Sequence, residues 1–269
     1  MSSQSEKNTR DELIEEWTGA WALDPKTDRE RRAAELARSS MKFTKSGSFI
    51  SPVAIASIDI LGITNLLSRI SLVEIAETFV EPFYNLSGPA YTFGRVGLSD
   101  RDMERLGFQR WAAIYSVSIS DTILMRRPDW ELGDRAIAEA EAVVALAHKV
   151  CEIIKINSAQ GVPLRAAIAF GECLISVGET RALLGAPTGE ASAWERRQEW
   201  IGGMLTPSAV AALRNGAEEA KEINGPDFRP RYPNVLLSYP IPLKSNGPAL
   251  PGPQVALNWV TGMIRGPSM

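Results

Sequence analysis

The stretch from residue 54 to residue 64 constrains the fold most, because an apolar run ends there on a carboxylate and then passes through a glycine. The run predicts a buried strand that ends at Asp59, and a carboxylate in such a place is costly to bury unpaired. Asp59 should therefore meet a cation, a hydrogen-bonding cluster or water. Gly62 allows a tight turn, and Thr64 can cap a following helix. A strand end whose Asp59 simply faces solvent is the competing interpretation.

Helical and alternating apolar patterns predict the remaining elements. Strands are expected at 53–59, 111–119, 122–125, 163–170, 173–177, 181–184, 200–205, 235–239 and 254–260. Helices are expected at 65–84, 130–158, 188–198 and 207–222, with a short helix at 99–106 inside an insertion at 85–108. The chain shows neither internal repeats nor low-complexity tracts, so one α/β or α+β domain is the economical interpretation.

The two ends of the chain differ from its middle. Amphipathic segments at 11–17 and 28–39 predict an N-terminal helical extension and linker over residues 1–48, before a single domain over 49–269. The tail carries prolines at 226, 230, 233, 240 and 242, so we expect edge strands at about 234–260 rather than a second domain.

Composition excludes some classes of function. The 269 residues carry a formal net charge of −3, which gives no support for nucleic acid as a partner. The polar N-terminus lacks the apolar core of a signal peptide, and no run reaches the roughly 18 apolar residues of a membrane span. We expect a cytoplasmic protein without a membrane partner.

Histidine and cysteine are scarce. The single histidine, His148, lies in a long helical pattern, while Cys151 and Cys173 lie in apolar stretches without metal-ligand spacing. All three are interpreted as core or helix-surface residues. A histidine-assisted nucleophile is therefore disfavoured, and metal or carboxylate chemistry is favoured.

A second acid, Asp121, stands at the tip of the hairpin predicted by 111–119 and 122–125. Two carboxylates from neighbouring strands, Asp59 and Asp121, can hold magnesium or manganese ions. Backbone amides at a turn that leads into a helix complement phosphate groups. Taken alone, two acids at this separation are weak evidence, because paired acids are commonly just solvated.

The order of motifs around these acids resembles the class III nucleotidyl cyclases. The family motif Phe-x-Asp-Ile-x-Gly-Phe-Thr is matched at the Asp, Ile, Gly and Thr positions of 57–64, and a Gly-Asp hairpin is matched by 120–124 with serine for glycine. The motif Leu-Arg-x-Gly-Ile-x-x-Gly-Glu is largely kept at 164–172. Segments 185–194 and 200–210 fill the places of the family's later helix and of its closing strand and helix start. The resemblance covers about 50–215.

The resemblance implies an α+β fold with a ferredoxin-like core, in which helices pack on a central, mostly antiparallel sheet. It makes Asp59 and Asp121 the catalytic, metal-binding acids, with Ile60 a third metal ligand through its carbonyl. It implies two Mg²⁺ or Mn²⁺ ions per active site, a nucleoside triphosphate substrate, and a homodimer with active sites at the interface. The residues that it assigns to the substrate are Ile60, Leu61, Gly62, Ile63 and Thr64.

Some positions depart from the family pattern. The Asn and Arg that hold the ribose and stabilise the transition state in family members fall at Gly189 and Ala193. The purine-reading Lys and Asp of typical adenylate cyclases fall near Val117 and Ala182. Adenine recognition of that kind is therefore unsupported.

Arg196 and Arg197 lie about one helical turn beyond these departures. Either could present a replacement guanidinium to the substrate, and we treat both as candidate substrate-binding residues. In the alternative interpretation they are a solvated basic pair balanced by Glu195 and Glu199.

The departures, the insertion and the strand at 256–259 resemble one branch of the family, the bacterial cyclases of Pycsar antiphage defence. That resemblance implies a metal-dependent pyrimidine cyclase, which converts UTP or CTP to the 3′,5′-cyclic monophosphate and pyrophosphate as a second messenger. Two alternatives stay open. One is a purine cyclase that acts on ATP or GTP, and the other is an inactive cyclase-like module for nucleotide binding or dimerisation.

Overall fold

A computed structural model of the chain describes residues 42–43, 49–62, 68–75, 77, 115–119, 121–126, 135–176, 182–227, 235–244 and 254–260. Their centre is a nine-stranded sheet. The strands are β1 Lys42–Phe43, β2 Phe49–Ile60, β3 Tyr115–Ile119, β4 Asp121–Arg126, β5 Leu164–Ser176, β6 Ala182–Leu184, β7 Gly202–Leu205, β8 Leu236–Tyr239 and β9 Gln254–Leu257. The helices are α4 Leu72–Ile75, α7 Arg135–Ala159, α8 Ala186–Arg197 and α9 Pro207–Asn224.

The main path of the sheet runs β3-β4-β2-β5-β7-β9-β8, with β1 beside β2 and β6 beside β5. Every strand pair is antiparallel except β5 with β7. The order β3-β4-β2-β5, with α7 between β4 and β5 in sequence, is the strand order of a ferredoxin-like core. The prediction of an α+β fold with a mostly antiparallel sheet is confirmed.

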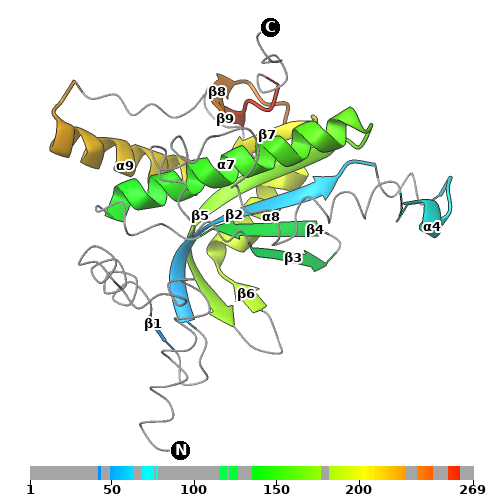
Figure 1. Ribbon diagram of the computed structural model, residues 1–269, viewed down its shortest axis with the longest axis horizontal. Coiled ribbons are helices and arrows are strands. Elements are labelled where there is room, and N and C mark those ends of the chain that lie inside the picture. The colour runs from blue at the N-terminus through cyan, green and yellow to red at the C-terminus, as the bar shows by residue number, and fades with distance from the viewer. Residues whose placement is uncertain are drawn as a thin grey trace, which may run out of the picture.

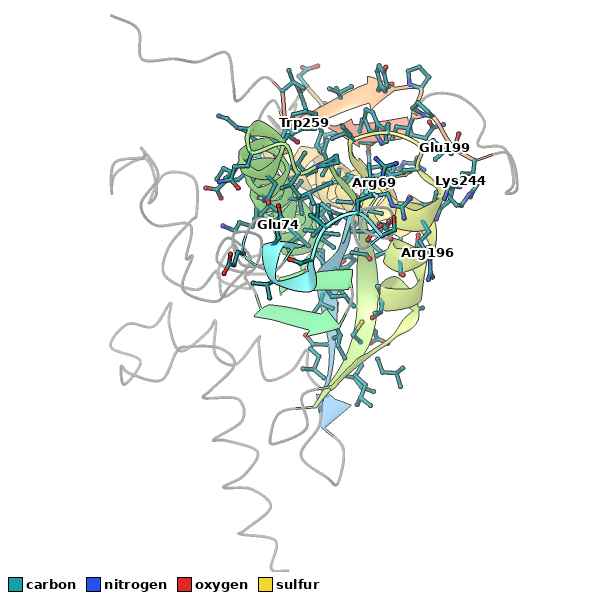
Figure 2. All side chains as sticks on the ribbon, turned by 90° about the vertical axis from the view of Figure 1, so that its right-hand side faces the viewer. Arg69, Glu74, Arg196, Glu199, Lys244 and Trp259 are labelled. Carbon is teal, nitrogen blue, oxygen red and sulfur yellow. The ribbon has the colours of Figure 1, made fainter. Side chains whose placement is uncertain are left out.

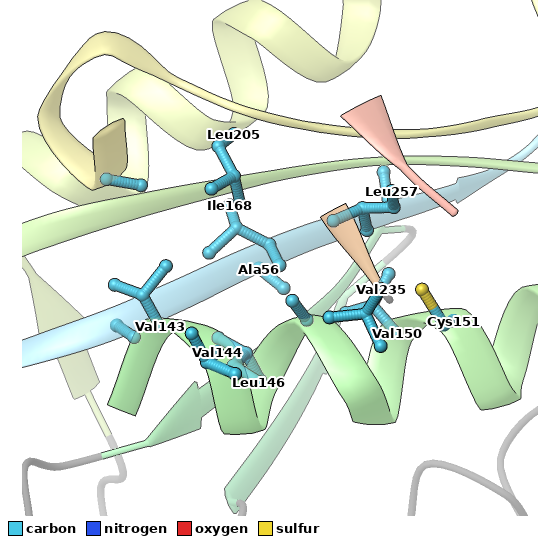
Figure 3. Packing of buried hydrophobic residues seen from close by; sticks show 14 of the residues in the cluster. Ala56, Val143, Val144, Leu146, Val150, Cys151, Ile168, Leu205, Val235 and Leu257 are labelled. Atoms are coloured by element: carbon cyan, nitrogen blue, oxygen red, sulfur yellow. The ribbon is translucent and has the colours of Figure 1, made fainter. Parts of the chain in front are cut away.

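Helices cover both faces of the sheet. Figure 2 shows α7 on one side of β2 and β5 and α8 on the other, and α9 packs along α7. The sheet residues under α7 have even numbers in β2 and β5, from Ala54 to Ile58 and from Leu164 to Ile168. Figure 3 shows side chains of this layer, including Ala56 and Ile168, facing Val143 and Leu146 of α7. Odd-numbered residues of the same strands therefore face α8.

The pairing of α7 with α9 depends on small side chains. A Cβ at Gly216 of α9 would lie 2.5 Å from Cβ of Ala140 and 2.7 Å from the carbonyl oxygen of Ala136. The carboxylate of Glu219 accepts a hydrogen bond from the Ile137 amide at 2.8 Å, in the first turn of α7. These contacts hold α9 against the beginning of α7 (Figure 1).

Two sequence predictions need correction in the centre of the sheet. The predicted strands at 163–170 and 173–177 are one strand, β5, which continues through Gly171 because twelve residues from Phe49 to Ile60 pair with it without a break. Gly171 does not end the strand. A Cβ there would lie 2.9 Å from Cγ of Pro187, so this glycine allows α8 to approach the sheet closely.

The helix predicted at 65–84 is also different in the described part. Residues 68–71 form a turn and bend, and α4 begins at Leu72. The Ser71 hydroxyl accepts a hydrogen bond from the Glu74 amide at 3.2 Å, so Ser71 caps the new helix start. Most of the remainder of that helix, the expected helices at 11–17, 28–39 and 99–106, and the whole insertion at 85–108 lie outside the described residues.

The tail strands join the same sheet, as β8 and β9. Of these two strands, β8 lies at one end of the strand path, whereas β9 lies between β7 and β8 and pairs with both. The prediction that both are edge strands is therefore wrong for β9. Among the helices that the structure describes, none combines the length and apolar character that crossing a membrane requires.

Candidate functional site

Asp59 lies at the end of β2, next to the last residue of that strand. Its direct neighbour across the β2–β5 pair is Arg165. The Asp59 side chain is only 18% exposed, so the strand delivers its carboxylate to a partly enclosed place. The interpretation that Asp59 faces solvent without a partner is wrong.

Asp121 is the first residue of β4, the strand on the other side of β2. The described register ends with Ile58 opposite Thr122, so one more step brings Asp59 opposite Asp121. Residues directly opposite in an antiparallel pair have Cβ atoms about 4.5–5.5 Å apart. The backbone therefore brings the two acids to one end of adjacent strands, while the Asp121 side chain lies outside the described residues.

Arg165 is the cation that meets Asp59. Its Nη2 donates to Oδ2 of Asp59 at 2.7 Å, and its Nε donates to Oε1 of Glu195. The Arg165 side chain is 14% exposed and the Glu195 side chain is 0% exposed, so the guanidinium joins a fully buried carboxylate to one nearer the surface. Burial of these charges is tolerable because they are paired.

Neither partner of this ion-pair chain is among the site residues predicted from the sequence. Arg165 is a charged residue inside an apolar strand, and antiparallel pairing of β2 with β5 would have pointed to it as a neighbour of Asp59. The interpretation of Glu195 as a solvated partner of the following arginines is wrong, because Glu195 is buried and contacts Arg165. Its place on the inner face of α8 depends on helix packing, for which local sequence gives no signal.

The turn after β2 is formed by Leu61 and Gly62. The Leu61 amide donates to the Pro163 carbonyl at 2.9 Å, so it extends the pairing with the start of β5. Gly62 has φ 81°, a left-handed conformation that favours glycine, and it is exposed. Amides for phosphate are thus expected from Gly62 onward, because the Leu61 amide is already bonded. Ile63 and Thr64 lie outside the described residues.

The two arginines at the end of α8 have other surroundings. Arg196 is exposed on the outer side of the helix (Figure 2), and the Arg197 guanidinium lies 4.3 Å from the centre of the Trp194 ring. The Arg197 carbonyl accepts a hydrogen bond from the Lys244 amide. Substrate binding by Arg196 and Arg197 stays a prediction. The arginine that the structure shows in contact with Asp59 is Arg165.

Gly189 and Ala193 are both exposed on α8. A Cβ at Gly189 would meet no atom within 4 Å, so a larger side chain fits there. The helix therefore leaves room at the position where the resembled family has its ribose-binding Asn.

The donors that the chain offers suit hard cations. Asp59 brings a carboxylate, Ile60 brings a carbonyl at the strand end, and Asp121 lies next to them by register. An ionised carboxylate has about four acceptor positions, of which the Arg165 Nη2 contact uses one. Oxygen donors of this kind fit magnesium or manganese. The described side chains alone contain no group of three or more His, Cys, Asp or Glu that could hold a metal.

Histidine and cysteine take no part in this site. Burial lowers the pKa of His148 in α7, on the opposite face of the sheet from α8. Burial also raises the pKa of the Cys151 thiol to about 12 and that of the Cys173 thiol to about 11. Thiols with such pKa values are poor nucleophiles at neutral pH, which agrees with the prediction that they are core residues.

Comparisons with known proteins gave matches among solved structures only. No family model and no curated protein matches the chain. The guanylate cyclase domain of RhGC from Catenaria anguillulae, in complex with GTP, is similar with a TM-score of 0.45 and 12% identity over 76% of this chain and 93% of that one. The adenylyl cyclase CyaB from P. aeruginosa is similar with a TM-score of 0.43 and 13% identity over 78% and 94%.

The monomeric guanylyl cyclase domain of the RhoGC fusion protein from Blastocladiella emersonii is similar with a TM-score of 0.42 and 15% identity over 61% of this chain and 85% of that one. Identities and TM-scores as low as these indicate a similar fold and do not identify a substrate or a metal for this chain.

Proposed function

We propose that this chain is a metal-dependent nucleotide cyclase that converts UTP or CTP to the 3′,5′-cyclic monophosphate and pyrophosphate. The observation that carries the proposal is the placement of Asp59 and Asp121 at one end of the adjacent strands β2 and β4. Two carboxylates so placed, with a carbonyl beside them at Ile60, form an oxygen-rich site for a metal–triphosphate substrate.

Each residue has a separate task in this proposal. Asp59, Asp121 and the Ile60 carbonyl would hold two Mg²⁺ or Mn²⁺ ions, whose chemistry is to neutralise triphosphate charge and to acidify the attacking 3′-hydroxyl. Gly62, with Ile63 and Thr64, would offer backbone amides to the phosphates. Arg165 adds a positive charge beside Asp59, and a guanidinium can pair with a phosphate oxygen.

Selection of a pyrimidine is the finer part of the proposal. It is supported by the resemblance to the pyrimidine cyclases of antiphage defence, and by Val117 and Ala182, near which the purine-reading Lys and Asp of adenylate cyclases would fall. A second-messenger role in defence and a homodimer with interfacial sites belong to the same proposal. Arg196 and Arg197 remain candidates for substrate contacts within such a dimer.

The test is a product assay. Purified protein is incubated with each of the four nucleoside triphosphates and Mn²⁺, and the products are identified by mass spectrometry. We expect cyclic UMP or cyclic CMP from wild type, and a loss of about 10²-fold or more in Asp59→Asn and Asp121→Asn. Asp227→Asn, which removes an exposed charge after α9, should keep wild-type activity. Cyclic AMP or cyclic GMP as the sole product would refute pyrimidine selection.

A second candidate function is a nucleotide-binding module without catalysis. Gly189 and Ala193 favour it, since neither side chain can hold a ribose or stabilise a transition state. Metal-dependent binding of a non-hydrolysable triphosphate, with unchanged nucleotide in the product assay, would support this candidate over the cyclase.

A further inference from the structure

We infer that Arg165 inhibits metal binding at the proposed metal site. In the nucleotide-free protein its ion pair with Asp59 lowers the affinity of that carboxylate for divalent cations. The inference rests on the proposed role of Asp59 as a metal ligand. The inference adds regulation by the substrate, because Arg165 must move away from Asp59 before both oxygens of that carboxylate can bind a metal.

The geometry of the guanidinium supports this role. Arg165 uses different nitrogens for its two partners, Nε for Glu195 and Nη2 for Asp59. Glu195 is fully buried in α8, so it is a fixed anchor, while Asp59 is nearer the surface. Because the two contacts are on separate nitrogens, the Nη2 end can leave Asp59 while the Nε end stays on Glu195.

Charge explains why the contact opposes a metal. Among these three side chains, one guanidinium is shared by two carboxylates. A divalent cation at Asp59 would lie beside the positive Arg165 in a place that is largely shielded from water, where repulsion is weakly screened. It would also compete with Nη2 for the Asp59 oxygens. Both effects lower the affinity of the nucleotide-free protein for the cation.

A triphosphate changes this balance. Its oxygens offer Arg165 a polyanionic acceptor in place of Asp59, and a guanidinium matches phosphate geometry well. Each shift of Arg165 toward phosphate returns Asp59 to the metal. Metal and nucleotide therefore favour each other's binding by one coupling free energy, which by linkage is equal in both directions.

The experiment measures Mn²⁺ binding to the full chain without nucleotide, by electron paramagnetic resonance of free Mn²⁺. We expect Arg165→Gln to bind Mn²⁺ about 5- to 100-fold more tightly than wild type. Asp59→Asn/Arg165→Gln should lose that gain, because the metal then lacks its carboxylate. Arg214→Gln removes the same charge from the exposed side of α9 and should bind as wild type does.

Arg165→Gln removes the cation that the buried Glu195 contacts and can destabilise the fold. Arg165→Gln/Glu195→Gln replaces the ion pair by two amides and should show the same gain in Mn²⁺ affinity, with folding checked by circular dichroism. Unchanged or weaker Mn²⁺ binding in both folded variants would overturn the inference.

The two proposals fail separately. If wild type forms a cyclic nucleotide and the Arg165 variants bind Mn²⁺ with unaltered affinity, the inference about Arg165 is refuted and the proposed cyclase function stands. If the Arg165 variants gain Mn²⁺ affinity through Asp59 but the protein forms no cyclic product, the inference about Arg165 stands and the proposed cyclase function is refuted.

Discussion

Arg165 and Asp59 are direct neighbours across β5 and β2, and Nη2 of the arginine donates to Oδ2 of the aspartate at 2.7 Å. The relationship is set by strand register, since a slip of one residue would turn either side chain to the opposite face of the sheet. The charge at the candidate site therefore depends on the long β2–β5 pairing, which Figure 1 shows at the centre of the sheet.

Gly62 and Gly161 form a matched pair for testing the turn after Asp59. Both have φ 81°, and a Cβ at either would meet no atom within 4 Å. Replacement by alanine should cost about 1–2 kcal/mol of stability at each position, because both need a left-handed backbone. We expect only Gly62→Ala to lower the proposed cyclase activity, measured as product formed at saturating nucleotide. An equal loss in Gly161→Ala would mean that stability, not the turn, limits activity.

Gly216 tests the packing of α9 against α7. A methyl group there would overlap Ala140 and the Ala136 carbonyl, so Gly216→Ala should lower the free energy of unfolding by about 1–3 kcal/mol. Gly189→Ala, in open space on α8, should instead raise it by about 0.4–1 kcal/mol by restricting the unfolded chain. Urea unfolding followed by circular dichroism measures both. A stabilised Gly216→Ala would contradict the tight contact.

Gln198 tests the junction between α8 and the sheet. Its fully buried amide donates to the Ala166 carbonyl at 2.7 Å and accepts from Nε1 of Trp200 at 2.7 Å. Gln198→Leu should cost about 1–3 kcal/mol, because both partners lose their bonds in a buried place. The exposed Gln160→Leu should change stability by less than about 0.5 kcal/mol. Similar melting temperatures for the two variants would count against the junction.

Cys151 gives a prediction for alkaline pH. Burial raises the pKa of its thiol from an ordinary 9.0 to about 12, so the folded protein keeps this proton at a pH where the unfolded chain loses it. The contribution to stability is therefore complete below pH 9 and falls as pH rises from 9 toward 12, by up to about 1.4 kcal/mol per unit.

Urea unfolding of wild type and Cys151→Ala between about pH 8 and 10.5 gives the free energy of unfolding of each protein as a function of pH. The difference between the two slopes against pH measures the contribution of the thiol. We expect the stability of wild type to fall more steeply than that of the variant. Parallel curves would show that the thiol proton is not linked to folding.

Local pattern in the sequence predicted much of the fold. The apolar run that ends at Asp59, the hairpin with Asp121 at its tip, the long helix α7 and the late helix α9 all have periodicities that local burial imposes. Glycine was a poorer guide, because Gly171 predicts a strand end and instead accommodates Pro187 from α8. A missing side chain signals a constraint without saying whether a turn or a close neighbour requires it.

The sequence by itself determined that two acids stand at strand ends and that histidine and cysteine chemistry is absent from its motifs, because residue type and spacing are local properties. Only the tertiary structure decided which cation meets Asp59. Arg165 is 106 residues away in sequence and Glu195 another 30, so their contacts depend on strand register and on the face that α8 turns inward. Neither is encoded in a short segment, since both follow from burying one sheet between two layers of helices.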